Sequence, residues 1–380
     1  MTGDGAERRS KLLRSARRIV VKVGSGVLTG GSYTDVDESM IEEISRQVAE
    51  LVSGGKKVAL VSSGAVALGA RTLGVPRRGL SIPVKQAAAA IGQSALISLW
   101  AKHFSTRGLK VGQVLLTHDD LRNRDRFVNS RNTLNTLFEF GAVPVINEND
   151  TVAVDEIKFG DNDTLSARVT NLVEADLLAI LSDVDGLYTA DPRLDPTATK
   201  IEFVEEVDDA VLKMAGDSSS RTGLGGMASK TRAAAEAARF GVCTVILPGL
   251  KKGALLSAVA GEAVGTLFFP HANRMDSKRH WIEYTLAVRG VITVDEGARD
   301  AIINKGRSLL ASGIMKVRGD FGCGDAVTIE GPDGKPFAKG LTNYDAREVG
   351  QIMGKHSNMI EATLGYKVYD EVVNRDDMAL

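Results

Sequence analysis

The sequence has little cysteine and little proline, and its charges nearly cancel. The 380 residues include two cysteines, Cys243 and Cys323, set far apart. This argues against a disulfide framework or a thiolate metal site and favours a reducing compartment. Because 47 Lys and Arg face 48 Asp and Glu, no overall basic field is present to hold nucleic acid or an anionic membrane. No apolar run is long enough for a signal-peptide core or a membrane-spanning helix, so we expect a cytoplasmic protein.

The composition is that of a soluble enzyme with more than one core. Hydrophobic residues make up 43% of the chain and charged residues 25%, and the length exceeds that of one ordinary domain. Residues 1–18 are rich in arginine, and we expect a frayed, solvated lead-in helix there. From residue 19 to about 265, short β-branched runs alternate with helical patterns. This alternation predicts an α/β fold, a three-layer αβα sandwich around a mostly parallel sheet.

Beyond residue 280 the strands shorten and turn sequences such as Gly331-Pro332-Asp333-Gly334 appear. This change predicts a second, smaller module, a mixed β-barrel-like domain. We therefore divide the chain into five segments: a basic N-terminal extension (1–18), an α/β domain (19–268), a linker (269–287), a C-terminal domain (288–367) and a tail (368–380).

Small and polar residues follow several of the predicted strands, at 22–26 (KVGSG), 62–65 (SSGA) and 147–150 (NEND). Each segment alone is most simply a turn. Together they favour a ligand site, because parallel sheets bind ligands at the carboxyl ends of their strands. Glycine-rich loops before helices suit an anion. Neither a Walker loop nor a G-x-G-x-x-G after the first strand is present, which disfavours an ordinary dehydrogenase.

Two lysines are candidates for binding a phosphate. Lys22 ends a hydrophobic strand, where a charge is costly unless it is used. Lys230 ends the segment 223–230 (GLGGMASK) and reads equally well as a solvated helix residue. The segment 160–163 (GDND) is either a helix cap or a site for the ammonium and carboxylate of an amino acid. Asp150 could also help to bind the ammonium group of the amino acid, or it could orient Lys22 and a metal.

The motifs resemble those of the glutamate 5-kinases, a branch of the amino acid kinase superfamily. The resemblance rests on VVKVGSGVLTGG, LVSSGAVALG, KQAAAAIGQ, VPVINENDTVA, EIKFGDND, SDVDGLYTADPR and GLGGMASK, in this order. It covers nearly the whole chain. The last domain, about 289–365, resembles a PUA domain, a small barrel that binds RNA in RNA-modifying enzymes.

The resemblance implies roles for individual residues. It implies catalytic roles for Lys22, Lys230 and Asp150, and leaves the metal ligands unknown. The implied glutamate contacts are Ser63, Gly64, Asp150, Asp161, Asn162 and Asp163. The implied ATP contacts are Lys22, Gly24, Ser182, Asp183, Leu224, Gly225, Gly226, Met227, Ala228, Ser229 and Lys230.

The implied reaction is transfer of a phosphoryl group from ATP, with Mg2+, to the side-chain carboxylate of L-glutamate, the first step of proline biosynthesis. Such a carboxylate is ionised at neutral pH and needs no general base. The resemblance also implies a homo-oligomer, a dimer or tetramer, and feedback inhibition by L-proline. Residues 277–355 carry a net charge of +2, which is weak for RNA binding.

Two alternatives stay open at this point. The chain could be an RNA-binding protein whose kinase-like part is a scaffold. It could also be a sibling kinase that acts on acetylglutamate, aspartate or uridylate.

Overall fold

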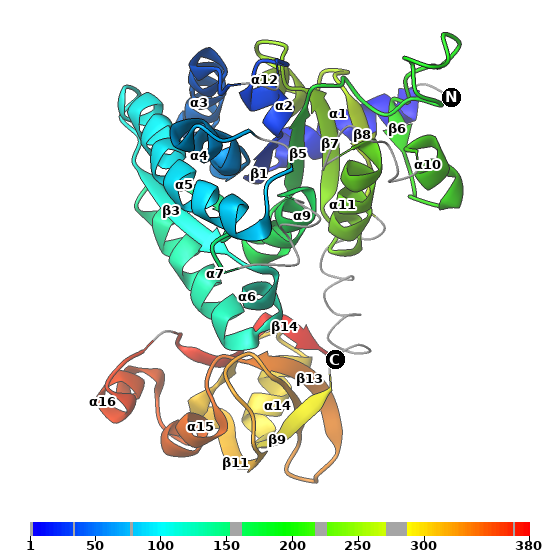
Figure 1. Ribbon diagram of the computed structural model, residues 1–380. Helices are drawn as coiled ribbons and strands as arrows, with labels where there is room; N and C mark the ends of the chain where they lie inside the picture. Colours follow the sequence, from blue (N-terminus) through cyan, green and yellow to red (C-terminus); the bar gives the residue numbers. More distant parts are fainter. Residues whose placement is uncertain are drawn as a thin grey trace. The chain divides into compact units, whose positions relative to one another are not determined.

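The structure is a computed structural model that describes residues 3–32, 35–76, 79–152, 162–216, 226–270, 287–367 and 369–380. It divides into two compact units, one made of residues 1–122 and 130–272 and the other of residues 123–129 and 273–380 (Figure 1). The domain boundaries drawn from the sequence stay predictions. No helix in the described ranges has the length and apolar character needed to cross a membrane.

The first unit is built on a largely parallel sheet. Its described strands have the order β3-β4-β2-β1-β5-β7-β8-β6, and all neighbours are parallel except β7 and β8. This arrangement confirms the predicted α/β class. The strands are β1 (Arg18–Val23), β2 (Lys57–Ser62), β3 (Val111–Leu116), β4 (Val143–Glu148), β5 (Leu177–Ser182), β6 (Phe203–Val204), β7 (Cys243–Pro248) and β8 (Thr266–Phe268).

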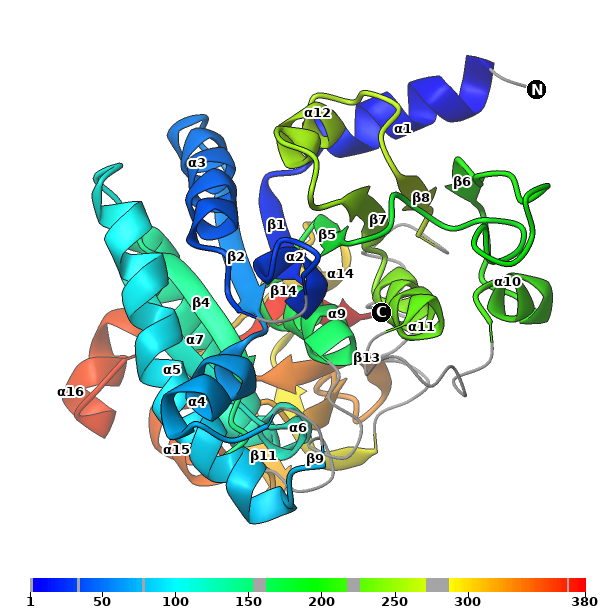
Figure 2. The same ribbon diagram turned by 45° about the horizontal axis from the view of Figure 1, so that its top comes forward.

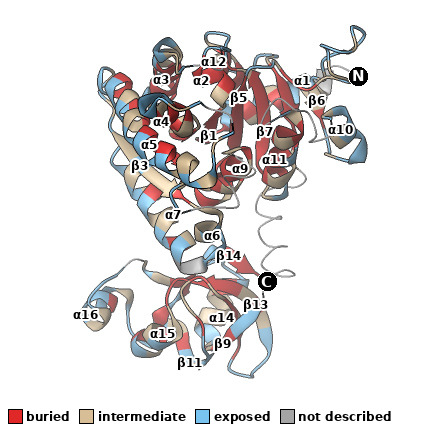
Figure 3. Ribbon diagram, viewed as in Figure 1, coloured by how far each residue is buried: buried red, intermediate tan, exposed pale blue. Residues whose placement is uncertain are grey.

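Helices cover both faces of this sheet, because its central strands are apolar on both sides (Figure 3). Ile19, Val21 and Val23 of β1 share a core with α3, α5 and α12, whereas α9 and α11 pack on the opposite face (Figure 2). The helices are α1 (Gly3–Ser15), α2 (Ser25–Leu28), α3 (Glu38–Ser53), α4 (Ala65–Leu73), α5 (Ile82–Ser105), α6 (His118–Arg122), α7 (Arg124–Glu139), α9 (Asn162–Leu172), α10 (Asp209–Met214), α11 (Met227–Arg239) and α12 (Ala254–Val259).

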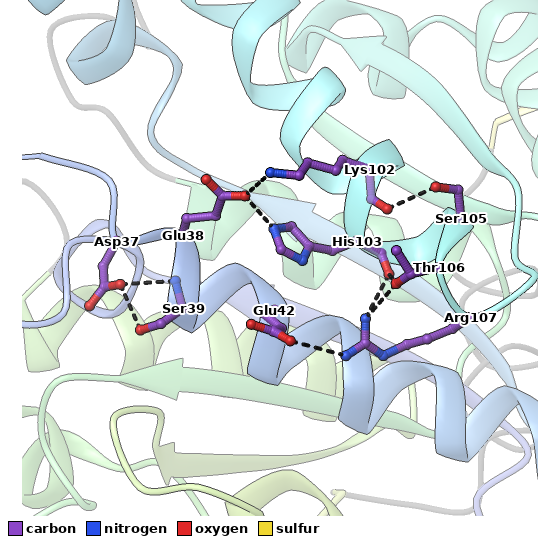
Figure 4. Close-up of polar contacts among 9 residues, drawn as sticks. All are labelled: Asp37, Glu38, Ser39, Glu42, Lys102, His103, Ser105, Thr106 and Arg107. Carbon is purple, nitrogen blue, oxygen red and sulfur yellow. Dashed lines mark hydrogen bonds and ion pairs between the residues drawn. The ribbon is translucent and has the colours of Figure 1, made fainter.

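Polar contacts join α3 to the last turn of α5 (Figure 4). Asp37 caps α3 by accepting a hydrogen bond from the backbone N–H of Ser39 at 2.9 Å. Glu38 accepts one from Lys102 Nζ at 2.5 Å, and its Oε1 lies 2.9 Å from His103 Nε2. Hydrogen bonds from Lys102 and His103 hold the pKa of Glu38 below its ordinary value. The C-terminal end of α5 is therefore tied to α3.

The N-terminal helix α1 is packed against the first unit, so our expectation of a solvated lead-in was wrong. Leu13 is fully buried. Arg9 is 2% exposed, and its guanidinium donates to the carbonyls of Glu262 and Val264. Arg14 Nε donates to the carbonyl of Ala260 at 2.7 Å. The guanidinium groups of Arg9 and Arg14 thus satisfy backbone carbonyls, a role that a count of charges does not reveal.

The second unit is a small mixed sheet. Its described strands have the order β10-β14-β13-β12-β9-β11, in which only β9 and β12 pair in parallel. The segment that we set apart as a tail forms strand β14 of this sheet. Its residues Val372 and Val373 are buried, so the segment is part of the core of the second unit. The elements are β9 (Val288–Val294), α14 (Glu296–Ile303), β10 (Leu309–Leu310), β11 (Ile314–Gly319), β12 (Ala326–Glu330), β13 (Pro336–Thr342), α15 (Ala346–Ile352), α16 (Ile360–Leu364) and β14 (Glu371–Ala379).

Candidate functional site

The candidate site lies at the carboxyl ends of β1, β2, β4 and β5, which adjoin one another in the sheet. Lys22 is the next-to-last residue of β1, in register with Val61 of β2 and Ile180 of β5. Strand alternation directs its neighbours Val21 and Val23 into the core beneath α3 and α5. The Lys22 side chain therefore lies on the opposite face, beneath α9.

The first turns of α9 and α11 bring three charged side chains together. Asp163 of α9 is fully buried and forms ion pairs with Lys22, through Oδ1, and with Lys230 of α11, through Oδ2 at 3.5 Å. Ser229 Oγ also donates to Asp163 Oδ2 at 2.8 Å. Lys22 and Lys230 are each 5% exposed. The two lysines, remote in the sequence, thus meet on one carboxylate.

Burial and charge act in opposite directions on this cluster. Burial works against the ionised form of Asp163, but attraction to Lys22 and Lys230 outweighs it, so the pKa of Asp163 lies below its ordinary value. Burial lowers the pKa of Lys230; the charge of Lys22 adds to this effect, while Asp163 and Asp183 oppose it. The three buried side chains Lys22, Asp163 and Lys230 together carry an excess of one positive charge. An anion that enters beside them gains from that excess.

A second group of polar side chains forms where β2 and β4 end. Asn162 Nδ2 is placed to donate to the carbonyl of Ser62 at 3.2 Å, to Ser63 Oγ at 3.1 Å and to Asn147 Oδ1 at 3.0 Å. Asn162 Oδ1 is buried and has no hydrogen-bond partner among the residues that the structure describes. It is a buried acceptor next to the donor contacts that the same side chain makes.

Two further glutamate candidates lie in the adjoining turns. Gly64 precedes α4 with a φ of 105°, a left-handed conformation that favours glycine over residues with a Cβ. Asp150 lies in the turn directly after β4 and is half-buried. Asp161 lies outside the described residues.

On the other side of Lys22, the residues predicted to contact ATP line the ends of β1, β5 and α11. Gly24 donates its backbone N–H to the carbonyl of Leu181 at 3.1 Å. Ser182 is buried at the end of β5, and its Oγ donates to Asp183 Oδ1 at 3.2 Å. Gly226 caps α11, whose first turn contains Met227, Ala228, Ser229 and Lys230. Leu224 and Gly225 lie outside the described part of the chain.

Comparison with known proteins identifies the family. The model of the amino acid kinase family matches residues 17–247, and that of the PUA domain matches residues 290–364. The chain belongs to the amino acid kinase family. It is 52% identical to the glutamate 5-kinase of Syntrophotalea carbinolica over 98% of this chain and 99% of that one. The glutamate 5-kinase of Geobacter sp. strain M21 is 50% identical over 98% and 100%. A UMP kinase from Bacillus anthracis aligns with a TM-score of 0.47 and 14% identity, covering 68% of this chain and 98% of that one.

In this amino acid kinase, the structure adds contacts to the site that the sequence did not predict. Asn147, which belongs to the 147–150 segment singled out from the sequence, is buried at the end of β4 and accepts a hydrogen bond from Asn162. Asp163, which the resemblance implies as a glutamate contact, pairs with two lysines and accepts a hydrogen bond from Ser229. Trp100 of α5 donates to Ser62 Oγ at 3.0 Å. No local sequence pattern predicts the contact between Trp100 and Ser62.

The part of the chain that the structure describes contains no ready-made metal centre. Within the ranges that the structure describes, no three His, Cys, Asp or Glu side chains could together hold a metal ion. Asp183 is nevertheless an exposed carboxylate beside Lys230. Such a single oxygen donor fits Mg2+ that arrives with a nucleotide, because that ion keeps phosphate and water ligands.

Proposed function

We propose that this protein transfers the γ-phosphoryl group of ATP to the side-chain carboxylate of L-glutamate, giving L-glutamyl 5-phosphate and ADP, the first step of proline biosynthesis. The observation that carries the proposal is the buried cluster of Lys22, Asp163 and Lys230 next to the polar pair Ser63 and Asn162. Relatives named glutamate 5-kinase, about 50% identical over the full chain, support the same reaction.

The reaction needs a reduction of the repulsion between the glutamate carboxylate and the γ-phosphate. It does not need a general base. A glutamate carboxylate has a pKa of about 4.3 in water and is already a nucleophile at neutral pH. It must approach the γ-phosphate to about 3–3.5 Å. Two unit charges 4 Å apart repel by about 1 kcal/mol in bulk water and by about 4 kcal/mol at an effective dielectric of 20. Buried cations that are held in place before the reaction offset this repulsion.

Lys22 and Lys230 supply those cations in our proposal. Asp163 fixes both ammonium groups without neutralising the pair, so a positive charge remains for the transferring phosphoryl group. Backbone N–H groups at the start of α11 and in the loop after β1 would add donors for the phosphates. Mg2+ would be held by the phosphates, by water and by Asp183, and would offset phosphate charge.

The amino-acid side of the site would hold glutamate by its α-groups. The acceptor Oδ1 of Asn162 and the carboxylate of Asp150 suit the ammonium. Ser63 and the backbone at Gly64, which precedes α4, suit the α-carboxylate. We also propose a cytoplasmic location, since two separated cysteines suit a reducing compartment, together with homo-oligomerisation and inhibition by L-proline.

The test is to measure acyl phosphate formation by hydroxylamine trapping and ADP release. L-Glutamate should give both products, whereas acetylglutamate, aspartate and UMP should give neither above background. Lys22→Ala and Lys230→Ala should each lower kcat by about a hundredfold or more, the scale of a lost transition-state donor. Lys213→Ala, an exposed lysine on α10, is the matched control and should leave kcat unchanged. A kcat within about threefold of wild type for Lys22→Ala would remove its assigned role.

A further inference from the structure

We propose that Trp100 is a positioning residue for residues 62–65, the loop after β2 that we assign to glutamate and call the glutamate-binding loop. It would act through the hydroxyl of Ser62. The inference rests on the proposed function of this loop. Trp100 does not belong to any strand end or glycine-rich segment of the site. It lies on α5, in the core shared by α3, α5 and the sheet, and is fully buried.

The contact between Trp100 and the loop is directional. The indole Nε1–H donates to Ser62 Oγ at 3.0 Å. Ser62, also fully buried, is the last residue of β2, and its Oγ donates to the carbonyl of Ser63 at 3.1 Å. An indole can only donate, so it occupies a lone pair of the hydroxyl and leaves the hydroxyl proton for Ser63. Trp100 thereby sets the rotation of the Ser62 side chain.

From Ser62 the hydrogen bonds continue to the groups that we assign to glutamate. Asn162 Nδ2 is 3.1 Å from Ser63 Oγ and 3.2 Å from the Ser62 carbonyl. Asn162 Nδ2 has two hydrogens for these acceptors and Asn147 Oδ1, so small shifts of the loop change which bonds are made. Holding Ser62 and Ser63 in place also fixes where Asn162 Oδ1 points.

A residue can position a loop only if it is itself held, and α5 meets this condition. A Cβ on Gly92 of α5 would lie 1.8 Å from the carbonyl oxygen of Ala65, the first residue of α4, so the two helices are in backbone contact there. Trp100 stacks on Phe104 with ring centroids 6.0 Å apart. The following turn is tied to Glu38 of α3 through Lys102 and His103 (Figure 4). The indole donor is thus fixed relative to the loop.

The decisive experiment is a double-mutant cycle between Trp100→Phe and Ser62→Ala, measured with full-length protein. Each single variant should raise the KM for glutamate about five- to tenfold, the scale of one lost hydrogen bond, with kcat and the KM for ATP within about twofold of wild type. The double variant should raise the KM no further than the larger single effect, because both changes remove the same bond. Ser62→Thr keeps the hydroxyl and should retain a KM near that of wild type.

Phe104→Leu is the matched control for packing. Phe104 is buried beside Trp100, so its truncation lowers stability in the same core. It leaves the indole donor in place and should therefore leave the KM for glutamate unchanged. A KM increase in this variant equal to that of Trp100→Phe would make the effect one of packing and overturn the proposal.

Tryptophan fluorescence gives a readout that is independent of turnover. The chain has two tryptophans, and Trp281→Phe leaves Trp100 as the only one. Glutamate added to this variant should change its emission with saturation, and Ser62→Ala in the same background should weaken the change. No response of Trp100 to saturating glutamate would count against the proposal.

The outcomes separate this proposal from the proposed function. If wild-type protein forms no acyl phosphate from glutamate, the function fails. If it does, a glutamate KM for Trp100→Phe within about twofold of wild type overturns the positioning role, and so do single effects that multiply in the double variant. If Trp100→Phe does not fold, the comparison of Ser62→Ala with Ser62→Thr decides the question. Equal KM values for glutamate in these two variants would overturn the proposal.

Discussion

At the scale of single residues, the site depends on one carboxylate. Asp163 is the shared counterion of Lys22 and Lys230, and all three side chains are buried. A buried charge that loses its partner is costly, whereas one with a well-placed partner is tolerated. Ionised Asp163 therefore favours the charged form of the two buried lysines, because it opposes the effect of burial on Lys230 and pairs with Lys22. In our proposal, stability and catalysis are therefore coupled at this residue.

This coupling predicts a pH-dependent effect for Asp163→Asn. The pKa of Asp163 is lowered in the folded protein because, although burial opposes ionisation, the attraction of Lys22 and Lys230 prevails. A lowered carboxyl pKa contributes stability above its unfolded value of about 3.9, and that stability is lost as pH falls through the folded pKa. At pH 7 the variant should lose about 3–5 kcal/mol in the free energy of unfolding. Below about pH 4 the difference in the free energy of unfolding between the variant and wild type should become smaller.

Urea unfolding at pH 7 and across the acid range measures this difference. Asp191→Asn is the matched control: hydrogen bonds from Arg193 lower the pKa of Asp191 to about 2, yet its carboxylate is solvated. That variant should unfold at nearly the wild-type urea concentration at pH 7. Equal stability of Asp163→Asn and wild type at pH 7 would contradict the role of Asp163 as a counterion.

At the scale of elements, α4 and α5 pack together next to residues 62–65, the loop that we assign to glutamate. A Cβ on Gly69 would lie 1.7 Å from the carbonyl oxygen of Ala88, and one on Gly92 would lie 2.7 Å from the backbone nitrogen of Gly69. The helices touch through their backbones, so neither glycine has room for a methyl group. Because α4 starts directly after Gly64, its position sets that of the loop.

Gly92→Ala should therefore affect both folding and substrate binding. The added methyl group forces α4 away from α5 and should lower the free energy of unfolding by about 1–3 kcal/mol, the range for an overpacked core. It should also raise the KM for glutamate. Gly350→Ala on α15 is the matched control, since its Cβ meets nothing within 4 Å, and it should be neutral or stabilising. Unchanged stability and KM for Gly92→Ala would contradict the close contact.

The sequence predicted the elements better than the contacts between them. Strand β1 was predictable from its β-branched run, and Lys22 attracted notice because a lysine at the end of such a run is costly. Three contacts join residues far apart in the chain: the meeting of both lysines on Asp163, the bond from Trp100 to Ser62, and the bond from Arg9 of α1 to the carbonyl of Glu262. Periodicity and turn signals report local structure, so they do not carry this information.

At the scale of the whole molecule, the second unit carries no net charge that would attract RNA. Its residues, 123–129 and 273–380, contain seventeen Lys and Arg and seventeen Asp and Glu, a net charge of zero. Arg318, which extends from edge strand β11, is paired with the buried Glu330 at 2.5 Å. Cations that are already paired release few counterions from a phosphate backbone. The PUA match at residues 290–364 therefore does not by itself imply nucleic-acid binding.

We accordingly expect weak RNA binding with little dependence on salt. In filter-binding titrations of the full-length protein against single-stranded and hairpin RNA, the plot of log affinity against log salt concentration should be nearly flat, because its slope scales with the number of phosphates neutralised. Affinity should stay at or below that of non-specific binding, about 10⁻⁴–10⁻⁶ M at physiological salt. The substitution Arg318→Ala should leave the affinity for RNA unchanged. Nanomolar affinity with a slope that indicates six or more phosphate contacts, as in a dedicated nucleic-acid-binding protein, would assign the second unit to RNA.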